Sequence, residues 1–177
     1  MNDTATLDAY GVLTEPTTLK IQRVLPGPIE RVWDYLTKSD LRKQWFASGD
    51  MTLVAGQPFT LTWRNEELNT PKGKRPEGRD EEHSSTNTIL EVDPPRKLVI
   101  TFGASGHVAF DLAARGDTVL LTLTHSRIPD RGTLLSVSSG WHAHLDILGG
   151  KLNGEDGPDF WTNWAKLRAE YETRLTA

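Results

Sequence analysis

The residues best suited to chemistry lie in one stretch of the chain, GWHAHLDILGGKL, at positions 140–152. His142, His144 and Asp146 stand there at alternate positions, next to Trp141. Imidazole and carboxylate groups can bind a metal ion or carry a proton. What they can do together depends on the secondary structure that positions them.

Apolar residues in this stretch recur with helical spacing and predict a helix over residues 134–152. A step of two residues crosses a helix, so His142 and His144 lie about 200° apart and cannot bind one ion together. His142 and Asp146 have the i,i+4 spacing of a weakly favourable pair, which we expect on the solvent-exposed face. The apolar sector of the helix contains Leu134, Val137, Ser138, Trp141, Leu145, Leu148 and Leu152.

His144 falls at the edge of this apolar sector. It is therefore either a polar residue at the rim of the core or a group that lines a cavity, where it forms a hydrogen bond or carries a proton. His107 and His125 lie in or near predicted strands, and nothing in their spacing requires them to join His144. The sequence thus assigns no metal ligands, no catalytic residues and no cofactor.

Other signatures of catalysis are absent from the chain. It has no cysteine, which excludes disulfides and thiolate zinc sites. It also lacks a G-x-S-x-G elbow, a phosphate-binding P-loop and a G-x-G-x-x-G motif. The acidic run Asp80 to Glu82 is expected to be a solvated part of a charged loop.

Composition places the chain among ordinary soluble domains. It has 177 residues, 37% of them hydrophobic and 25% charged, with a formal net charge of -4. No clustered excess of Lys and Arg suggests a nucleic-acid partner. No apolar run is long enough for a membrane-spanning helix, and the first residues lack the pattern of a secretory signal. We therefore expect a cytoplasmic location and no membrane partner.

The chain divides into elements by changes in hydrophobic period. Residues 1–16 are expected to be a flexible arm, and residues 17–177 a single domain. Short spacings between the strand-like runs leave no room for crossover helices, so their pairing should be antiparallel. The predicted order is a strand at 17–25, two helices within 26–46, two short strands within 51–63, a charged loop at 64–85, four strands within 86–128, and helices over 131–154 and 158–175. The charged loop is expected to be mobile, with a binding lid as the alternative.

Six tryptophans are many for this length, and two of them, Trp161 and Trp164, lie on the last predicted helix. The apolar stripe of that helix must dock on something. It either caps the domain or forms a homodimer contact. A curved sheet around one long helix can also leave an apolar cavity with a few polar groups at its rim, which is typical of a small-molecule pocket.

Several phrases resemble one family. RVLPGPIERVWDYLTKSDLRKQWF, ILEVDPPRKLVITFG, LLTLTHSRIPD and GWHAHLDILGGKLNG are similar to segments of the START-like superfamily, also called SRPBCC or helix-grip proteins. The resemblance is strongest to the branch related to the activator of heat-shock-protein-90 ATPase, and it covers roughly residues 17–153.

The resemblance implies an α+β helix-grip fold. In this fold a curved antiparallel sheet of about six to seven strands wraps around a long C-terminal helix, with a cavity between them, and two short helices follow the first strand. Here the helix at 158–175 would be an addition, and it would alter access if it packed across the cavity mouth. The family includes lipid and polyketide binders, aromatases or cyclases, and cochaperone domains. They share no single catalytic set, so the resemblance transfers none.

The leading hypothesis is a non-catalytic protein that binds a small hydrophobic or aromatic molecule between the sheet and helix 134–152. One alternative is an enzyme of cyclase, hydrolase or isomerase type with His144 as the acid/base. Another is a cochaperone-like domain that modulates a chaperone ATPase. The candidate ligand-binding residues are Trp45, Phe59, Trp63, Phe102, Phe110, Trp141, His144 and Leu148.

Overall fold

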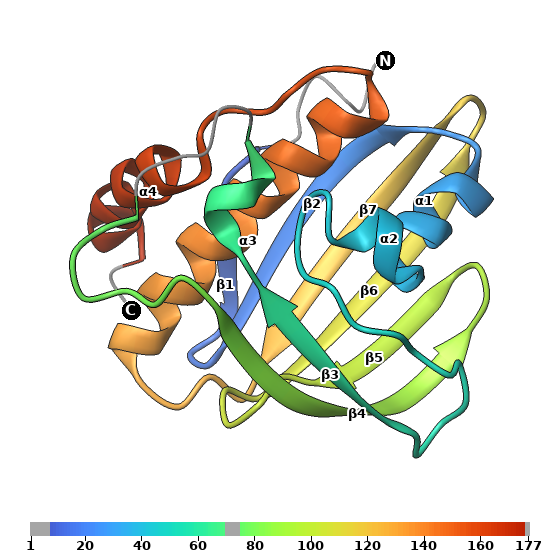
Figure 1. Ribbon diagram of the computed structural model, residues 1–177, viewed down its shortest axis with the longest axis horizontal. Helices are drawn as coiled ribbons and strands as arrows, with labels where there is room; N and C mark the ends of the chain where they lie inside the picture. Colours follow the sequence, from blue (N-terminus) through green and yellow to red (C-terminus); the bar gives the residue numbers. More distant parts are fainter. Residues whose placement is uncertain (1–7, 70–74, 176–177) are drawn as a thin grey trace.

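A seven-stranded antiparallel sheet, in the order β1-β2-β7-β6-β5-β4-β3, curves around one long helix, α3, in the computed structural model (Figure 1). The structure describes residues 8–69 and 75–175. The α+β helix-grip fold predicted from the sequence is confirmed. The strands are β1 (Val12–Glu15), β2 (Thr18–Pro26), β3 (Pro58–Trp63), β4 (His83–Asp93), β5 (Lys97–Thr101), β6 (His107–Arg115) and β7 (Thr118–Ser126).

The inner face of the sheet is apolar because buried and partly exposed residues alternate along each central strand. In β7 the residues Val119, Leu121 and Leu123 are fully buried, and their neighbours in sequence are partly exposed. Leu123 lies opposite Phe110 of β6 and Ile21 of β2 in the register of the sheet. This period of two turns one row of side chains toward α3.

Helix α3 (Arg131–Leu152) is buried on more than one side. The carboxylate of Asp130 caps it by accepting a hydrogen bond from the backbone N–H of Thr133 at 2.7 Å. The sheet covers one side of the helix, and helix α4 (Phe160–Arg174) packs against another (Figure 1). Side chains on the face of α3 that points away from the sheet are therefore buried under α4 and not exposed to water.

Asn69 holds the start of α4 in place. Its side-chain oxygen accepts a hydrogen bond from the backbone N–H of Phe160 at 2.8 Å, and its side-chain nitrogen donates to the carbonyl of Pro158 at 3.0 Å. Asn69 follows the short 3-10 helix η2 (Asn65–Leu68), which contacts α4. The segment after β3 thus fixes the end of α4 that lies nearest the cavity described below.

Helices α1 (Ile29–Thr37) and α2 (Ser39–Arg42) follow β2, as predicted. Arg42, at the end of α2, is only 2% exposed. Its guanidinium donates to the carbonyls of Leu36 at 3.2 Å, Ala47 at 3.1 Å and Gly49. Burial lowers the pKa of Arg42 to about 10. These bonds fold the chain after α2 back into the core.

Some predictions of local structure are wrong. Residues 12–15 form β1 and pair with β2, although the sequence analysis assigned them to a flexible arm. Residues 51–54 form no strand, because Gly56 and Gln57, and not this segment, bond to Ile89 of β4. The predicted loop at 64–85 contains η2 and the first residues of β4, and its residues 70–74 lie outside the described part of the chain.

Within the described residues, no helix combines the length and the apolar character needed to span a bilayer.

Candidate functional site

A cavity of about 580 Å³ lies between α3, α4 and the edge of the sheet that β3 and β4 form. Its volume is within the usual range of small-molecule pockets. Seven of its 21 lining residues are phenylalanine or tryptophan. The lining consists of Phe46, Trp63, Asn65, Gly78, Arg79, Asp80, Glu81, His83, Ser85, Phe102, Gly103, Ala104, Ser105, Ser136, Val137, Gly140, Trp141, His144, Phe160, Trp161 and Trp164.

Phe46 stands at the centre of the aromatic wall. Its ring lies 4.9 Å from the ring of Trp141, 5.3 Å from that of Trp63 and 6.4 Å from that of Phe102, between centroids. Phe46 reaches this position because the bonds of Arg42 turn the chain inward just before Gly49. Rings from α3, β3 and the turns therefore meet in one cluster.

The orientation of Trp141 is fixed from outside the cavity. Its indole Nε1–H donates to Nδ1 of His125 on β7 at 3.0 Å. Nε2 of the same imidazole lies 2.6 Å from the carbonyl oxygen of Ser105 and donates to it. Burial lowers the pKa of His125 to about 4, so the ring is neutral and both nitrogens are used. His125 thus forms hydrogen bonds both with Trp141 and with the turn between β5 and β6.

His144 presents an imidazole to the cavity. Its Nδ1 donates to the carbonyl oxygen of Trp45 at 2.8 Å, and the ring is only 5% exposed. Burial lowers the pKa of His144 to about 4, which keeps the imidazole neutral. Nε2 has no hydrogen-bond partner among the described residues. A neutral ring with Nδ1 protonated leaves Nε2 as an acceptor.

Helix α4 forms one wall of the cavity through Phe160, Trp161 and Trp164. The ring of Phe160 lies 4.5 Å from that of His144, and Trp161 and Trp164 meet edge to face at 5.6 Å. Nε1 of Trp161 is buried without a partner in the described structure. A cap on the domain and a homodimer contact were both possible roles for this helix, and here it forms a wall of the cavity.

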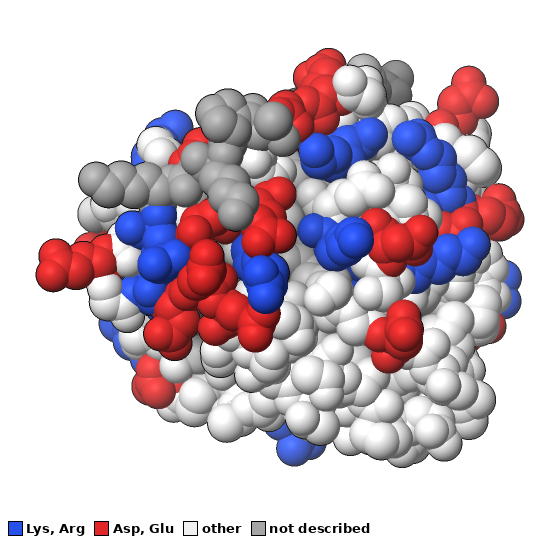
Figure 2. All heavy atoms as spheres, in the orientation of Figure 1, with Lys and Arg blue, Asp and Glu red and all other residues white. Residues whose placement is uncertain are grey.

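Charged residues gather at the mouth of the cavity. Arg79, Asp80 and Glu81 are exposed and line it, and the guanidinium of Arg79 lies 4.6 Å above the ring of Trp164. Figure 2 shows acidic and basic side chains interspersed on this face of the molecule. The mouth is therefore polar and of mixed charge, whereas the interior is mainly apolar.

The turn between β5 and β6 forms the opposite lip of the mouth. The backbone N–H of Gly103 donates to the side-chain oxygen of Asn87 at 2.7 Å. Gly106 has a φ of 99°, and a Cβ there would lie 2.0 Å from the carbonyl oxygen of Ser126. Only glycine fits this close approach, so the turn is held tightly against β7.

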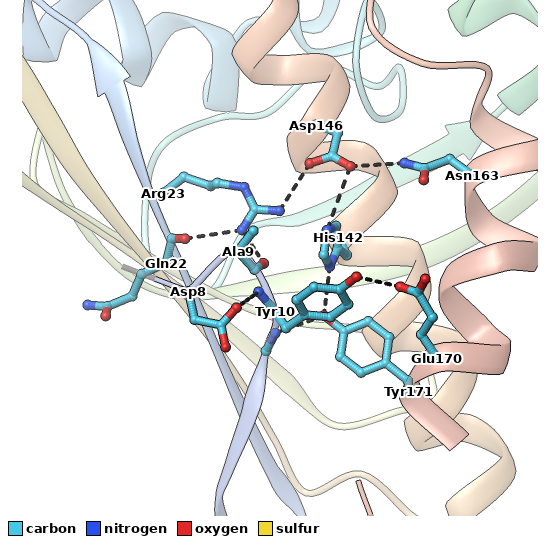
Figure 3. A network of polar contacts seen from close by, with 11 residues as sticks. Asp8, Ala9, Tyr10, Gln22, Arg23, His142, Asp146, Asn163, Glu170 and Tyr171 are labelled. Atoms are coloured by element: carbon cyan, nitrogen blue, oxygen red, sulfur yellow. Dashed lines mark hydrogen bonds and ion pairs between the residues drawn. The ribbon is translucent and has the colours of Figure 1, made fainter. Parts of the chain in front are cut away.

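A second polar cluster lies at the contact of α3, α4 and the start of β1 (Figure 3). Nδ1 of His142 bonds to the hydroxyl of Tyr171 at 2.8 Å, and that hydroxyl also accepts the backbone N–H of Gly11 at 2.7 Å. Asp146 accepts from Arg23 at 3.1 Å and from Asn163 at 2.9 Å. This cluster joins the two helices to the sheet and contributes no residue to the cavity.

The prediction that His142 is solvent-exposed is wrong. Nε2 of His142 does lie 3.7 Å from Asp146, as the i,i+4 spacing predicted, but His142 is only 5% exposed. Burial lowers its pKa to about 4. Helix α4 covers the face of α3 that was assigned to water, because Tyr171 packs against this imidazole.

Four of the eight predicted ligand-binding residues line the cavity: Trp63, Phe102, Trp141 and His144. The other four are buried in the core and are absent from the lining: Trp45, Phe59, Phe110 and Leu148. Trp45 turns its indole N–H to the carbonyl of Tyr35 at 2.8 Å, so it supports the site through its own carbonyl and not through its ring.

Phe46, the mouth residues and the side chains of α4 line the cavity without having been among the predicted ligand-binding residues, although packing of this helix across the mouth was one expectation. The apolar stripe on α4 was a usable signal, because such a stripe must cover another apolar surface. Phe46 carried no comparable signal, since its direction depends on the buried Arg42. Among residues 8–69 and 75–175, no group of three or more His, Cys, Asp or Glu side chains could hold a metal ion.

Known proteins resemble this chain both in sequence and in fold. The family model described as "Activator of Hsp90 ATPase homolog 1-like protein" matches residues 26–153. A solution structure of a Bordetella parapertussis protein is 36% identical, with a TM-score of 0.79 over 100% of this chain and 97% of that one. No curated protein matched the sequence.

More distant structures share the fold. CalU16 from Micromonospora echinospora is 22% identical, with a TM-score of 0.67 over 90% of this chain and 89% of that one. A conserved protein of unknown function from Enterococcus faecalis is 20% identical, with a TM-score of 0.70 over 94% of this chain and 89% of that one.

Proposed function

The chain belongs to the family of activator of Hsp90 ATPase homolog 1-like proteins, within the START-like superfamily, and from this premise we propose that it binds a small, mainly aromatic molecule in the cavity between the sheet, α3 and α4. Membership supports a domain that binds a small ligand or acts on one in the manner of a polyketide cyclase.

The observation that carries the proposal is the lining of the 580 Å³ cavity. Three phenylalanines and four tryptophans line this space, together with nine polar or charged residues, of which Arg79, Asp80 and Glu81 stand at the mouth. Removing apolar ligand surface from water contributes about 25 cal/mol per Å². Aromatic walls add the preference of rings for edge-to-face and offset contacts. A flat apolar guest therefore gains most in this cavity.

Gly140 allows a sharp test of this proposal. It lines the cavity on α3, and a Cβ built there meets no atom within 4 Å. Gly140→Leu should fill the space without disturbing the fold. Gly149→Leu is the matched control, because Gly149 lies on the same helix with the same free space and is not part of the lining.

Wild type and both variants would be screened for thermal stabilisation by a panel of uncharged aromatic compounds. We expect several compounds to stabilise the wild type and Gly149→Leu, and none to stabilise Gly140→Leu. Native mass spectrometry of the purified wild type should show the same compounds bound. No binding to wild type, or equal binding to Gly140→Leu, would contradict the proposal.

A cyclase-like activity is a second candidate, and Nε2 of His144 favours it. His144 lines the cavity and its Nδ1 is bonded to Trp45, so Nε2 is the nitrogen that could remove a proton from a bound substrate. Its low pKa makes it a weak base, which argues for binding as the main role. Mass analysis of a β-polyketone, incubated with and without the protein, separates the two functions, because only an enzyme speeds the loss of water in the cyclising aldol condensation above its spontaneous rate.

A further inference from the structure

The polar groups of the cavity differ in what they can accept or donate. The hydroxyls of Ser105 and Ser136 rotate, so each can be a donor or an acceptor. His144 has no such freedom. Its Nδ1–H is committed to the carbonyl of Trp45 at 2.8 Å, which leaves Nε2 as an acceptor only.

The ring of His144 is also fixed in place. Phe46 meets it edge to face at 4.9 Å, and Phe160 lies 4.5 Å from it on the other helix. The carbonyl that holds it belongs to Trp45, which is fully buried and is itself anchored to Tyr35. A ring held by these contacts cannot turn to offer a donor to the ligand.

An acceptor inside an apolar cavity discriminates between guests. A ligand hydroxyl satisfies it, whereas an ether brings no donor and leaves the lone pair unpaired. A carboxylate brings negative charge against a lone pair and into an aromatic wall, which is costlier still. The residue therefore selects by chemistry and not only by shape.

We propose that His144 is a specificity-determining residue and that the ligand is a neutral aromatic molecule with a hydroxyl group, a phenol, that donates to Nε2 of His144. The inference rests on the proposed function, because it assigns the chemistry of the molecule bound in the same cavity. It adds a requirement that apolar burial does not impose.

Three probes of similar size test it: 2-naphthol, 2-methoxynaphthalene and 2-naphthoate, each titrated into the wild type by calorimetry. A lost hydrogen bond to a buried acceptor corresponds to roughly tenfold in affinity. We expect 2-naphthol to bind about tenfold more tightly than its methyl ether, and 2-naphthoate to bind more weakly than either.

Two variants show whether His144 is responsible. His144→Asn keeps a donor near the carbonyl of Trp45 and replaces Nε2 by an amide oxygen, an acceptor on a shorter side chain, and His144→Phe keeps an aromatic ring and removes both nitrogens. The preference for 2-naphthol should weaken in His144→Asn and disappear in His144→Phe, with ether affinity changed by less than about threefold. The thermal unfolding midpoint reports whether each variant folds. The comparison of the three ligands in the wild type depends on neither variant.

The outcomes separate this inference from the proposed function. Equal binding of 2-naphthol and its ether to the wild type would overturn the role of His144 and leave an apolar binding site standing. A preference that survives in both variants would overturn it in the same way. Failure of all three probes to bind the wild type would overturn both proposals.

Discussion

The indole N–H of Trp141 and Nδ1 of His125 are 3.0 Å apart, and this bond joins the helix inside the sheet to strand β7. Because the other nitrogen of His125 donates to Ser105, one imidazole connects α3, β7 and the lip of the cavity mouth. The wall of the candidate site is thus held by a residue that does not line it.

Replacing His125 with leucine should destabilise the protein. The change leaves the indole N–H of Trp141 and the carbonyl of Ser105 without partners in a buried environment, at a cost of about 2–4 kcal/mol. Urea unfolding at neutral pH measures this loss. The control is His107→Leu on the adjacent strand β6, since His107 forms no hydrogen bond through its side chain within the described residues. A similar loss in both variants would contradict the role given to His125.

Acid should destabilise the fold through its buried histidines. The pKa of His125, His142 and His144 is lowered to about 4 by burial, whereas the unfolded chain protonates its histidines near 6.5. The stabilisation is therefore complete above about pH 6.5 and is lost as the pH falls toward 4. Each histidine contributes up to roughly 1.4 kcal/mol per pH unit in that window.

The urea midpoint measured between about pH 7 and pH 5 tests this sign. We expect it to fall with pH in the wild type and to fall less steeply in His125→Leu, which has one fewer titrating group. A midpoint that stays constant or rises on acidification would show that these histidines are not neutral in the folded state.

Arg42 should be as important to stability as a core residue. Arg42→Met retains the apolar stem and removes every bond to the carbonyls of Leu36, Ala47 and Gly49, so we expect a loss of about 2–4 kcal/mol. Lys43→Met is the control, because Lys43 is exposed and adjacent in sequence. The same urea experiment measures both. Equal urea midpoints for Arg42→Met and Lys43→Met would refute the role of Arg42 in stability.

Arg42 also shows where sequence reasoning stops. Alternation along β7 and helical spacing around Trp141 were enough to predict this strand and the long helix, because period and burial are linked directly. The cavity was one of two alternatives that the pattern left open, and it was also implied by the resemblance to the START-like superfamily. Arginine is rarely buried, so nothing in the sequence marked Arg42 as the residue that turns Phe46 inward. Four of the eight residues predicted to line the cavity lie in the core and outside the lining.

His142 shows the second limit. Its assignment to solvent followed from treating α3 as a helix with one buried side, and it failed because α4 supplies a second buried contact. The stripe on α4 predicted that the helix docks, but no pattern specified which face of α3 receives it. The docked position is set by contacts far apart in sequence, such as Asn69 with Phe160.

The hydroxyl of Tyr171 should account for much of this docking. Tyr171→Phe removes the acceptor for the N–H of Gly11 and the partner of His142, so we expect a loss of about 1–3 kcal/mol. Burial raises the pKa of Tyr171 to about 12, so the hydroxyl stays protonated throughout the neutral range. The control is Tyr35→Phe, whose hydroxyl forms no hydrogen bond within the described part of the chain.

A double-mutant cycle with His142→Leu isolates the bond between the imidazole and this hydroxyl. We expect the two changes to be less than additive by about 1 kcal/mol, because either one alone already breaks the contact. Hydrogen exchange should show faster opening of α4 in Tyr171→Phe, since that helix loses its link to β1 through Gly11. Additive effects with unchanged exchange would mean that α4 is held by its apolar stripe alone.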